Sequence, residues 1–347
     1  MNRIERLTCK LNAAEGAYIT SRAGIFYYSG FTSEDAALVI TKKDAVLITD
    51  SRYLIQAKIQ APNFRIYNIA DGLDKLFGEL ALERLGFEEA YMTVSEYERL
   101  KAALKAELSA MGKEIAEPRR IKEPGEIEKI RAAESLGDAA FSHVLTKLHA
   151  GMTELEAAFE IESFMRKNGA SGTSFETIVA SGKRSALPHG TATEKVIENG
   201  DFVTMDFGCV LDGYCSDMTR TVVIGAASER QREIYNVVLS AQRAAIAAAC
   251  EGIACSEVDK VARDIIKEAG YGDCFGHSLG HSVGIEIHEN PNFSPRSGDC
   301  TQCGNVITVE PGIYIEGFGG VRIEDIVAIT PKNVQNLTKS EKELIII

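Results

Sequence analysis

The chain has 347 residues, 45% of them hydrophobic and 25% charged, and its formal net charge is −12. This composition is that of a globular protein large enough for two cores, and its acidic excess disfavours binding to nucleic acid or to an anionic membrane. No apolar run is long enough to span a bilayer and the N-terminus lacks the apolar segment of a signal peptide, so we expect a cytoplasmic protein whose eight cysteines are reduced.

Residues 1–120 are expected to form a small α/β domain. Helix-like segments such as 94–110 alternate with short strand-like runs, which lie at 17–20, 37–40, 45–48 and 64–67. No cluster of metal-ligating residues occurs in this part of the sequence. We therefore expect the chemistry in a second domain, residues 121–347.

The second domain is predicted to begin with a long helix. The segment Lys122-Glu-Pro-Gly125 punctuates the chain, and apolar residues then recur at broadly helical spacing as far as Leu148. Two further helices are predicted to begin at Thr153 and Ser228, because each is followed three residues later by Glu or Gln, the pattern of a capping box.

Between those two helices, two carboxylates lie in a predicted β-hairpin. Asp206 and Asp217 belong to apolar strand-like runs joined by a segment with Asp212-Gly213, a strong two-residue turn signal. With that turn, Asp206 faces Thr219 and Asp217 is its diagonal neighbour on the same sheet face. The hairpin therefore points two carboxylates in one direction.

A second hairpin of the same kind is predicted near the C-terminus. Glu310 ends one strand-like run and Glu324 lies in the next, with the glycine-rich turn 317–320 between them. If this turn centres on Phe318, Glu310 lies opposite Ile326 and Glu324 is one diagonal away on the same face. Four carboxylates converge if the two hairpins are adjacent.

The two hairpins resemble copies of one element. Segments 200–208 and 304–312 align without gaps, with Gly, Thr, an acid and Gly at matching places. A second match, at an offset of 101, relates Gly151, Glu156 and Gly169 to Gly252, Glu257 and Gly270, and each set frames a helix-like stretch. These matches indicate an internal duplication with the site at its centre.

Four carboxylates in a partly desolvated place repel one another, so some must hold protons unless cations neutralise them. One imidazole among four carboxylates suits Mn²⁺, Co²⁺, Fe²⁺ or Zn²⁺. We therefore predict a site for one divalent metal ion or a pair, with Mn²⁺ favoured, whose ligands are Asp206, Asp217, His281, Glu310 and Glu324. Paired ions would hold a bridging hydroxide near neutral pH and polarise a carbonyl, which is the chemistry of metal-assisted hydrolysis. The alternative, that these are solvent-facing acids of edge strands, suits each residue alone but not the matching parity of both hairpins.

Four of the six histidines lie close to the hairpins in sequence: His189, His277, His281 and His288. Because His281 and His288 are seven residues apart, an extended strand would place them on opposite faces. A bend near Gly284 is therefore needed if both reach one site. We interpret His277 as a hydrogen-bonded structural residue.

Together these motifs resemble those of the pita-bread metallopeptidases, the family of methionine aminopeptidase, aminopeptidase P, prolidase and creatinase. The matching stretches are Pro188-His189-Gly190, Met205-Asp206-Phe207-Gly208, Ser216-Asp217-Met218-Thr219-Arg220-Thr221, Gly280-His281 to His288-Glu289, Glu310-Pro311-Gly312-Ile313-Tyr314 and Arg322-Ile323-Glu324-Asp325. They cover the chain from about residue 120 to its end, in family order. The resemblance implies an α/β N-terminal domain followed by an α+β pita-bread catalytic domain with an internal duplication.

Carried over by position, the resemblance implies a role for each predicted metal ligand. Asp206 is a terminal ligand of one ion, while Asp217 and Glu324 bridge both ions. His281 and Glu310 hold the second ion, and Glu310 also carries the proton of the attacking water.

Three further residues receive roles from the same resemblance. His189 and His288 look like the pair that contacts the substrate and stabilises the tetrahedral oxyanion. Arg322 lies two residues before Glu324, so it points to the same face and could pair with a ligand carboxylate.

Within this family, the extra N-terminal domain and the Arg322-Ile-Glu-Asp325 run resemble aminopeptidase P and prolidase. The resemblance implies a metallo-exopeptidase whose N-terminal domain helps form a homodimer and restricts the active site to short proline-containing peptides. It would cleave the bond before proline, which general peptidases handle poorly because proline is rigid and lacks an N–H. Aminopeptidase P removes the first residue of longer peptides, whereas prolidase accepts only dipeptides, and both alternatives stay open at this point.

Two other functions compete with this interpretation. Residues 280–284 match the G-x-S-x-G pattern of serine hydrolases, with Ser282 as nucleophile. That fold needs an acid and then a histidine well downstream of the serine, but the only later histidine is His288, with just Glu286 between. A non-catalytic pita-bread scaffold is the other alternative, and such a descendant would be expected to have lost ligands. Cys300-Thr-Gln-Cys303 is a single CxxC and is interpreted as a loop feature, since a structural zinc site needs two more ligands.

Overall fold

The computed structural model describes residues 2–11 and 14–347. The chain divides into two compact units, Met1–Arg119 and Arg120–Ile347. Within the described ranges, no helix combines the length and the hydrophobicity that crossing a bilayer requires.

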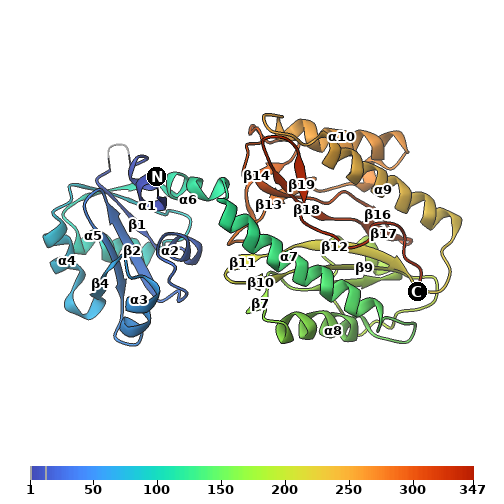
Figure 1. Cartoon of the computed structure of the whole chain (residues 1–347), viewed down its shortest axis with the longest axis horizontal. Helices are drawn as coiled ribbons and strands as arrows, with labels where there is room; N and C mark the ends of the chain where they lie inside the picture. Colours follow the sequence, from blue (N-terminus) through green and yellow to red (C-terminus); the bar gives the residue numbers. More distant parts are fainter. Residues whose placement is uncertain (1, 12–13) are drawn as a thin grey trace. The chain divides into compact units, whose positions relative to one another are not determined.

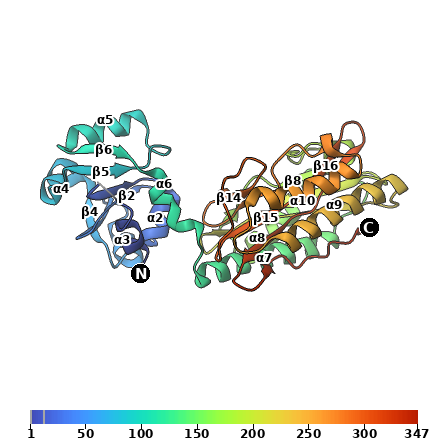
Figure 2. The same ribbon diagram turned by 90° about the horizontal axis from the view of Figure 1, so that it is seen from above.

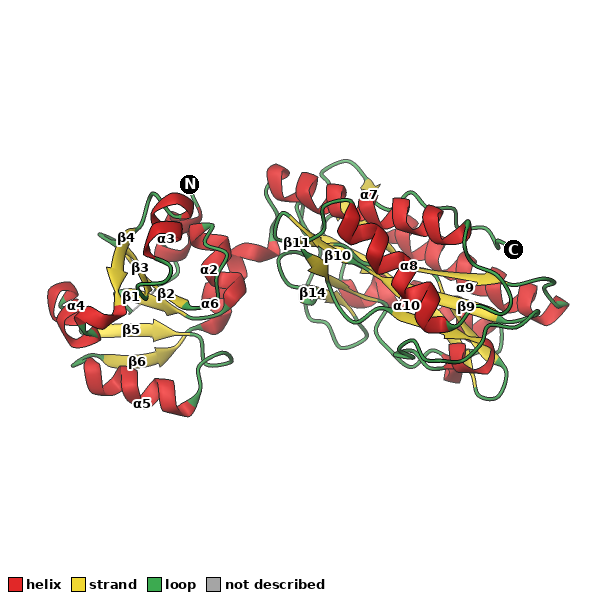
Figure 3. Ribbon diagram, turned by 90° about the horizontal axis from the view of Figure 1, so that it is seen from below, coloured by secondary structure: helices red, strands yellow, loops and turns green. Residues whose placement is uncertain are grey.

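The first unit is built on a six-stranded mixed sheet with the order β4-β3-β2-β1-β5-β6 (Figure 3). Its strands are β1 (Gly16–Ile19), β2 (Ala36–Thr41), β3 (Ala45–Thr49), β4 (Arg65–Asn68), β5 (Arg84–Phe87) and β6 (Glu107–Ala110). Its helices are α1 (Arg3–Thr8), α2 (Arg22–Ser29), α3 (Leu54–Gln60), α4 (Leu73–Leu80), α5 (Val94–Ala103) and α6 (Gly112–Ala116). Apolar residues of α4 and α5, among them Phe77 and Leu100, pack with the buried side chains of the strands. The α/β class predicted for this part of the chain is confirmed.

One helix of this unit is shorter than the sequence indicates. The segment 94–110 forms α5 only as far as Ala103, and its last four residues form strand β6. Strand β6 pairs with β5 in parallel. That pairing is a long-range contact, so it overrides the local pattern from which the longer helix was predicted.

Four long helices lie along the strands of the second unit (Figure 1). They are α7 (Pro124–Leu145), α8 (Glu154–Lys167), α9 (Glu229–Ala248) and α10 (Cys255–Glu268). The predicted capping boxes are present, because Thr153 caps α8 and Ser228 caps α9. Pro124 occupies the first turn of α7, where its missing N–H costs nothing.

The strands of the second unit form several small sheets (Figure 2). The strands of the first half are β7 (Gly172–Thr173), β8 (Ile178–Ser181), β9 (Phe202–Phe207), β10 (Cys209–Leu211), β11 (Tyr214–Cys215) and β12 (Met218–Val223). Those of the second half are β13 (Gly280–Ser282), β14 (Glu289–Phe293), β15 (Val306–Val309), β16 (Gly312–Ile315), β17 (Gly319–Arg322), β18 (Asp325–Ile329) and β19 (Val334–Asn336). The sheets that matter for the site have the orders β12-β9-β8 and β14-β13-β15-β18-β19.

The two halves of this unit repeat the same series of elements. A helix pair, α7 with α8 or α9 with α10, precedes antiparallel strands in each half, and each pair contributes to a separate apolar core. Helices α8 and α10 both have 14 residues. The glycines before and after them, at 151, 169, 252 and 270, all have positive φ. Such backbone favours glycine, so the same turns frame both helices and the predicted duplication is confirmed.

The first predicted hairpin has the expected register. Asp206 pairs with Thr219 across β9 and β12. The turn residues Asp212 and Gly213 have φ values of 48° and 81°, as a two-residue turn of this kind requires.

The second hairpin differs from its prediction by two residues. Ile315 pairs with Gly319, so the turn centres on Gly317, whose φ is 74°, rather than on Phe318. A glycine is favoured there because only glycine adopts this backbone without strain.

This shift changes the partner of Glu310 but not its face. The pairs on either side, Val309 with Asp325 and Gly312 with Arg322, place Glu310 opposite Glu324 instead of Ile326. Because the error is an even number of residues, both acids stay on the predicted side of the sheet.

Candidate metal centre

One cavity in the second unit, of about 490 Å³, contains every predicted site residue. These residues are His189, Asp206, Asp217, His281, His288, Glu310, Arg322 and Glu324. Residues separated by more than 130 positions in sequence are thus neighbours in space. A cavity of this size can hold a small peptide.

The five candidate ligands are positioned by strands and strand ends. Asp206 lies within β9 and His281 within β13. Asp217 and Glu324 directly precede β12 and β18, and Glu310 directly follows β15. Strand ends place a side chain accurately while leaving it at the edge of a sheet, where a ligand can reach it.

Backbone hydrogen bonds join the two halves beside these acids. The N–H of Glu324 donates to the carbonyl oxygen of Thr219 at 3.1 Å. The hydroxyl of Thr221 lies between the backbone N–H and C=O of Arg322, at 3.2 and 3.0 Å. The adjacency that the four-carboxylate hypothesis needs is therefore present.

Three of the five side chains form the tightest group. One ligand atom each from Asp217, His281 and Glu324 lies within 4.8 Å of the other two. Glu310 is close to them, because its Oε1 lies 3.5 Å from Nε2 of His281, the same distance as Oδ2 of Asp217. Asp206 lines the same cavity but lies outside the group of three.

Burial and mutual repulsion raise the pKa of three of these carboxyl groups. Desolvation is the main cause for Asp217 and Glu324, whose pKa values lie well above the ordinary range, and the neighbouring carboxylates raise them further. Burial raises the pKa of Glu310 to about 8, although Arg322 opposes it. Without cations, the cluster would have to hold protons at neutral pH.

Two further observations fit a divalent cation here. Oδ1 of Asp206 is buried and has no hydrogen-bond partner within the described part of the chain. An unsatisfied buried oxygen costs about 1–3 kcal/mol, which a cation would offset. Burial, followed by the nearby His288, lowers the pKa of His281 to about 4, so its imidazole is neutral and able to ligate at neutral pH.

Two threonine hydroxyls hold the carboxylates in place. Thr219 donates to Oε2 of Glu324 at 2.6 Å, and Thr308 donates to Oε1 of Glu310 at 3.1 Å. Outer partners of this kind orient ligand side chains. This role was not predicted from the sequence, although Thr308 lies two residues before Glu310 and therefore on the same strand face.

The guanidinium of Arg322 is bound on all three nitrogens. Nη2 donates to Oδ2 of Asp206 at 2.6 Å, and Nη1 donates to the Tyr314 hydroxyl at 2.8 Å and to the Pro188 carbonyl at 3.1 Å. Nε donates to the Thr219 hydroxyl at 3.1 Å. The side chain is only 3% exposed, so these contacts fix Asp206 in one orientation.

Tyr314 and Glu134 are two supporting residues whose roles were not predicted from the sequence. The Tyr314 hydroxyl also contacts Nε2 of His277 at 2.9 Å, and its even spacing from Glu310 could have placed it on the site face. Glu134 of α7 is fully buried and accepts the backbone N–H of Asp217 at 3.2 Å. A glutamate inside the apolar stripe of a helix was the signal for it.

The expected bend between the two site histidines is present. The pairing of β13 with β14 shifts its register after His281, and the N–H of Gly284 donates to the carbonyl oxygen of Glu286 within the intervening loop. The rings of His281 and His288 consequently lie 4.3 Å apart between centroids. His277, interpreted as structural, is hydrogen-bonded at both ring nitrogens.

A buried ion pair supports this bend, and its removal gives a testable prediction. Nζ of Lys122 lies 3.1 Å from Oε2 of Glu289, the residue after His288, and the two side chains are 1% and 4% exposed. Lys122→Met should lower the unfolding free energy by about 3–5 kcal/mol, because it removes the cation that neutralises a buried carboxylate. Urea denaturation would measure this. The matched control is Lys260→Met, whose exposed pair with Asp264 is screened by solvent; equal losses in the two variants would contradict the prediction.

The raised carboxyl pKa values predict how the stability of the metal-free protein depends on pH. Between about pH 6.5 and 8, folded Glu310 keeps a proton that the unfolded chain, with an ordinary pKa of 4.5, has lost. The folded state therefore binds more protons, and its stability falls as pH rises. The lowered pKa values of His277 and His281 act in the opposite direction, but only below their ordinary 6.5.

We therefore expect the Tm of metal-free protein to fall from about pH 6.5 to 8 and that of protein loaded with Mn²⁺ to fall much less. Scanning calorimetry at several pH values would measure both. A metal-free Tm that rises over this interval would contradict the pKa directions.

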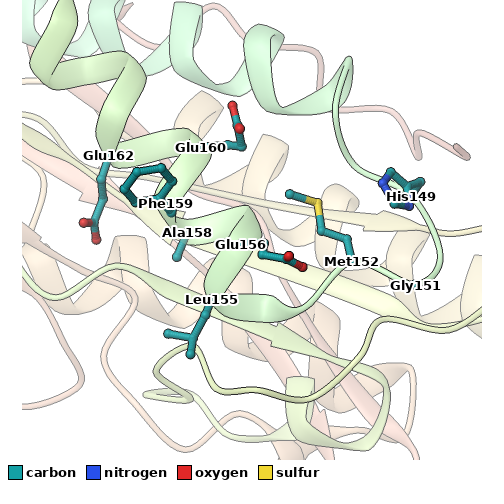
Figure 4. A pocket seen from close by; sticks show the side chains of 9 residues that line it. All are labelled: His149, Gly151, Met152, Leu155, Glu156, Ala158, Phe159, Glu160 and Glu162. Carbon is teal, nitrogen blue, oxygen red and sulfur yellow. The ribbon is translucent and has the colours of Figure 1, made fainter.

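A second hollow, of about 660 Å³, follows the exposed side of α8 (Figure 4). Two of its three acids have other partners, because Glu156 belongs to the capping box with Thr153 and Glu160 lies 2.8 Å from Nε2 of His143. Among the described residues, no group of three metal-ligand atoms lies there. The candidate metal ligands therefore belong to the cavity around Asp217.

The structure gives no support to the serine-hydrolase alternative. Ser282 is fully buried, and its hydroxyl donates to the carbonyl oxygen of Pro291 at 2.8 Å. A serine nucleophile needs a base within hydrogen-bond reach and access to substrate. Cys300 and Cys303 are free thiols and belong to no metal-ligand group among the described residues.

Comparisons with known proteins agree with this geometry. Residues 128–331 match metallopeptidase family M24, and residues 3–121 match the creatinase/prolidase N-terminal domain. The chain is 40% identical over 353 residues to an Xaa-Pro dipeptidase of Pyrococcus furiosus, with 99% of each chain covered.

Two solved structures have the same fold. An Xaa-Pro dipeptidase from Bacillus anthracis superposes with a TM-score of 0.97 at 45% identity over 99% of each chain. An X-Pro aminopeptidase from Thermotoga maritima gives 0.94 at 39% identity over 100% of each chain. The predicted fold class, an α/β N-terminal domain followed by a pita-bread catalytic domain, is thus confirmed. The chain therefore belongs to metallopeptidase family M24.

Proposed function

We propose that this protein hydrolyses the bond before proline at the N-terminus of short peptides, using two divalent metal ions. The observation that carries this proposal is the convergence of four carboxylates and one imidazole in a single buried cavity. Relatives named for Xaa-Pro cleavage, at 39–45% identity over nearly the whole chain, support the choice of substrate.

In this proposal, the two ions would be held by the five predicted ligands: Asp217 and Glu324 would be shared by both ions, Asp206 would serve one, and His281 with Glu310 would serve the other. When bound, the ions would supply Lewis acidity, lowering the pKa of a water molecule and polarising the scissile carbonyl. Four carboxylates offset the charge of two divalent ions, which explains why a site with such raised pKa values can exist in a folded protein.

The remaining steps belong to side chains of the cavity. Glu310 takes the proton of the attacking water at a carboxylate oxygen and passes it to the leaving proline nitrogen. His189 and His288 line the cavity and donate hydrogen bonds to the oxyanion of the tetrahedral intermediate. Arg322 holds Asp206 through its Nη2 contact, so that this carboxylate keeps one orientation throughout.

Apolar side chains of the same cavity suit the proline ring. Phe175, Ile178, Pro188 and Ile287 line it beside the polar groups. A cavity that combines an apolar wall with a few fixed polar groups is typical of a small-ligand site. Proline also lacks an N–H, so no donor of the substrate is left unsatisfied against this wall.

The proposal is tested by metal reconstitution. Metal-free protein would be incubated with Mn²⁺, Co²⁺, Zn²⁺ or Fe²⁺ in turn, and release of the first residue from Ala-Pro-containing peptides would be measured against Ala-Ala controls. We expect metal-dependent cleavage before proline only. A loaded sample that cleaves no Xaa-Pro peptide of any length would favour the scaffold alternative, and cleavage that resists chelators would favour a serine hydrolase.

A further inference from the structure

We propose that residues 338–341, which follow strand β19, set the spacing of the two carboxylates that both ions would share, with Thr338 as the positioning residue. This inference rests on the proposed function, because it takes Asp217 and Glu324 as the shared ligands. Ions of a two-metal site lie about 3.5–4 Å apart, and their ligands must keep the productive geometry to within about 0.5 Å. The spacing of the two carboxylates is therefore a quantity that the fold must control.

A row of three hydrogen bonds connects Asp217 to strand β18 through Thr338. The backbone N–H of Asp217 donates to Oε2 of Glu134 at 3.2 Å, and the hydroxyl of Thr338 donates to Oε1 of the same carboxyl group at 2.7 Å. This hydroxyl also accepts the backbone N–H of Ile326, two residues after Glu324, at 2.9 Å. One hydroxyl thus joins helix α7, which holds Asp217, to the strand that begins directly after Glu324.

The link through Thr338 is shielded from water. The exposed fractions of Glu134, Thr338 and Ile326 are 0%, 4% and 0%. A buried polar group that loses its partner cannot turn to solvent instead, so it stays unsatisfied unless the structure around it shifts. Removal of the Thr338 hydroxyl would therefore let α7 and β18 move relative to each other.

The next residues of the segment hold the second shared ligand. The guanidinium of Arg220 is buried, and its Nη1 donates to the backbone carbonyl oxygen of Glu324 at 2.6 Å. Its Nη2 and Nε donate to the backbone carbonyl oxygens of Ser340 and Glu341, both at 2.9 Å. Residues 338–341 thus contact the supports of both shared ligands.

Thr338 can act on the ions only through other residues. Among the described residues, it is not one of those that line the cavity of the candidate ligands. A shift of Asp217 relative to Glu324 would weaken the binding of both ions, because each ion would depend on both carboxylates. Loss of the Thr338 hydroxyl should therefore appear as a lower metal affinity of a protein that keeps all five ligands.

Thr338→Val tests the positioning role. Valine keeps the shape of threonine but can neither donate to Glu134 nor accept from Ile326. We expect the affinity of metal-free protein for Mn²⁺, measured by titration calorimetry, to fall roughly 10- to 100-fold, as for other outer partners of metal ligands. Thr338→Ser keeps the hydroxyl and should restore the affinity of the parent protein.

Thr301→Val is the matched control for a loss of stability alone. Thr301 is equally buried, and its hydroxyl donates to the backbone carbonyl oxygens of Cys250 and Ile253 in a loop before α10. This variant should lower the urea midpoint, as Thr338→Val does, but should leave Mn²⁺ affinity unchanged. An equal loss of affinity in both variants, or an unchanged affinity in Thr338→Val, would overturn the inference.

Glu134→Met tests the same link from helix α7, so the inference stays testable if Thr338→Val does not fold. It removes the acceptor of two of the three hydrogen bonds and should lower Mn²⁺ affinity at least as much as Thr338→Val. In the Glu134→Met background, Thr338→Val should cause no further loss, because its partner is already absent. A further loss as large as that in the parent protein would contradict the shared route.

The affinity measurement separates this inference from the proposed function, because it needs no cleavage. A parent protein that binds Mn²⁺ and cleaves no Xaa-Pro peptide, with the order of the variants as expected, would refute the proposed function alone. Full Mn²⁺ affinity in Thr338→Val, in a protein whose parent cleaves Xaa-Pro peptides, would refute the inference alone.

Discussion

Asp217→Ala is expected to abolish peptidase activity and to lower the metal content below two ions per chain. Asp217 offers an oxygen within 4.8 Å of ligand atoms of both His281 and Glu324, so in the proposed arrangement its loss opens both metal sites. The loss should exceed the roughly 10- to 100-fold effect typical of an outer partner of a ligand. Elemental analysis and turnover of an Xaa-Pro peptide, measured on the same preparation, would show both effects.

His189→Ala is the matched control for this substitution. His189 lines the same cavity but is not part of the close group of metal-ligand atoms, so its loss should leave metal content intact and lower turnover. Full metal occupancy in Asp217→Ala would contradict its assignment as a bridging ligand. Loss of metal in His189→Ala would contradict the separation of metal-binding and substrate-binding groups.

Glu310→Gln should lower kcat by roughly 10²–10⁴-fold, the usual contribution of a general acid or base. Glutamine has nearly the size of glutamate, but its amide can neither accept the proton of water nor pass it to the leaving nitrogen. It is also a weaker ligand, so metal content must be measured at each concentration of added Mn²⁺. The quantity that tests the prediction is kcat at saturating metal, because weaker metal binding no longer contributes there and only the loss of proton transfer lowers the rate.

Thr308→Val provides a graded comparison for Glu310→Gln. It removes the hydroxyl that donates to Oε1 of Glu310 at 3.1 Å but leaves the carboxylate itself. We expect a loss of roughly 10- to 100-fold, as for other outer partners of metal ligands. If Glu310→Gln lost less activity than Thr308→Val, Glu310 would not be the proton carrier.

The candidate site could be predicted from the sequence because the position of a residue in a strand decides to which face of the sheet its side chain points. The side-chain period in a strand is two, so the parity of Asp206 and Asp217 around Asp212-Gly213 placed both acids on one face. The same rule survived an error in the second hairpin. The turn there centres on Gly317 instead of Phe318, but an even shift exchanges the partner of Glu310 without moving it to the other face.

Helix starts were equally local. Thr153 and Ser228 cap the helices predicted from their capping boxes, because the hydrogen bonds of a cap involve only residues three positions apart. The segment 94–110 shows that local patterns do not predict pairing between distant strands. Its last four residues belong to β6, whose partner β5 lies more than 20 residues away, and no local periodicity reports that pairing.

The supporting contacts of the site were decided by packing. Tyr314 reaches Arg322 and His277, and Glu134 of helix α7 accepts a hydrogen bond from the backbone N–H of Asp217. The contacts with His277 and with Asp217 join elements whose distance in space does not follow from their spacing in sequence. The contacts of Arg322 with Thr219 and Asp206 are of the same kind.

The sequence by itself determined the two-part architecture, the duplicated hairpins and the identity of the candidate ligands, because these depend on periodicity, turn chemistry and like-charge repulsion. Only the tertiary structure decided how close the candidate ligands come to one another, which carboxyl groups have raised pKa values and that Arg322 binds Asp206. The physical reason is that distance and desolvation arise when separate strands pack together, and neither quantity is encoded in any single stretch of the chain.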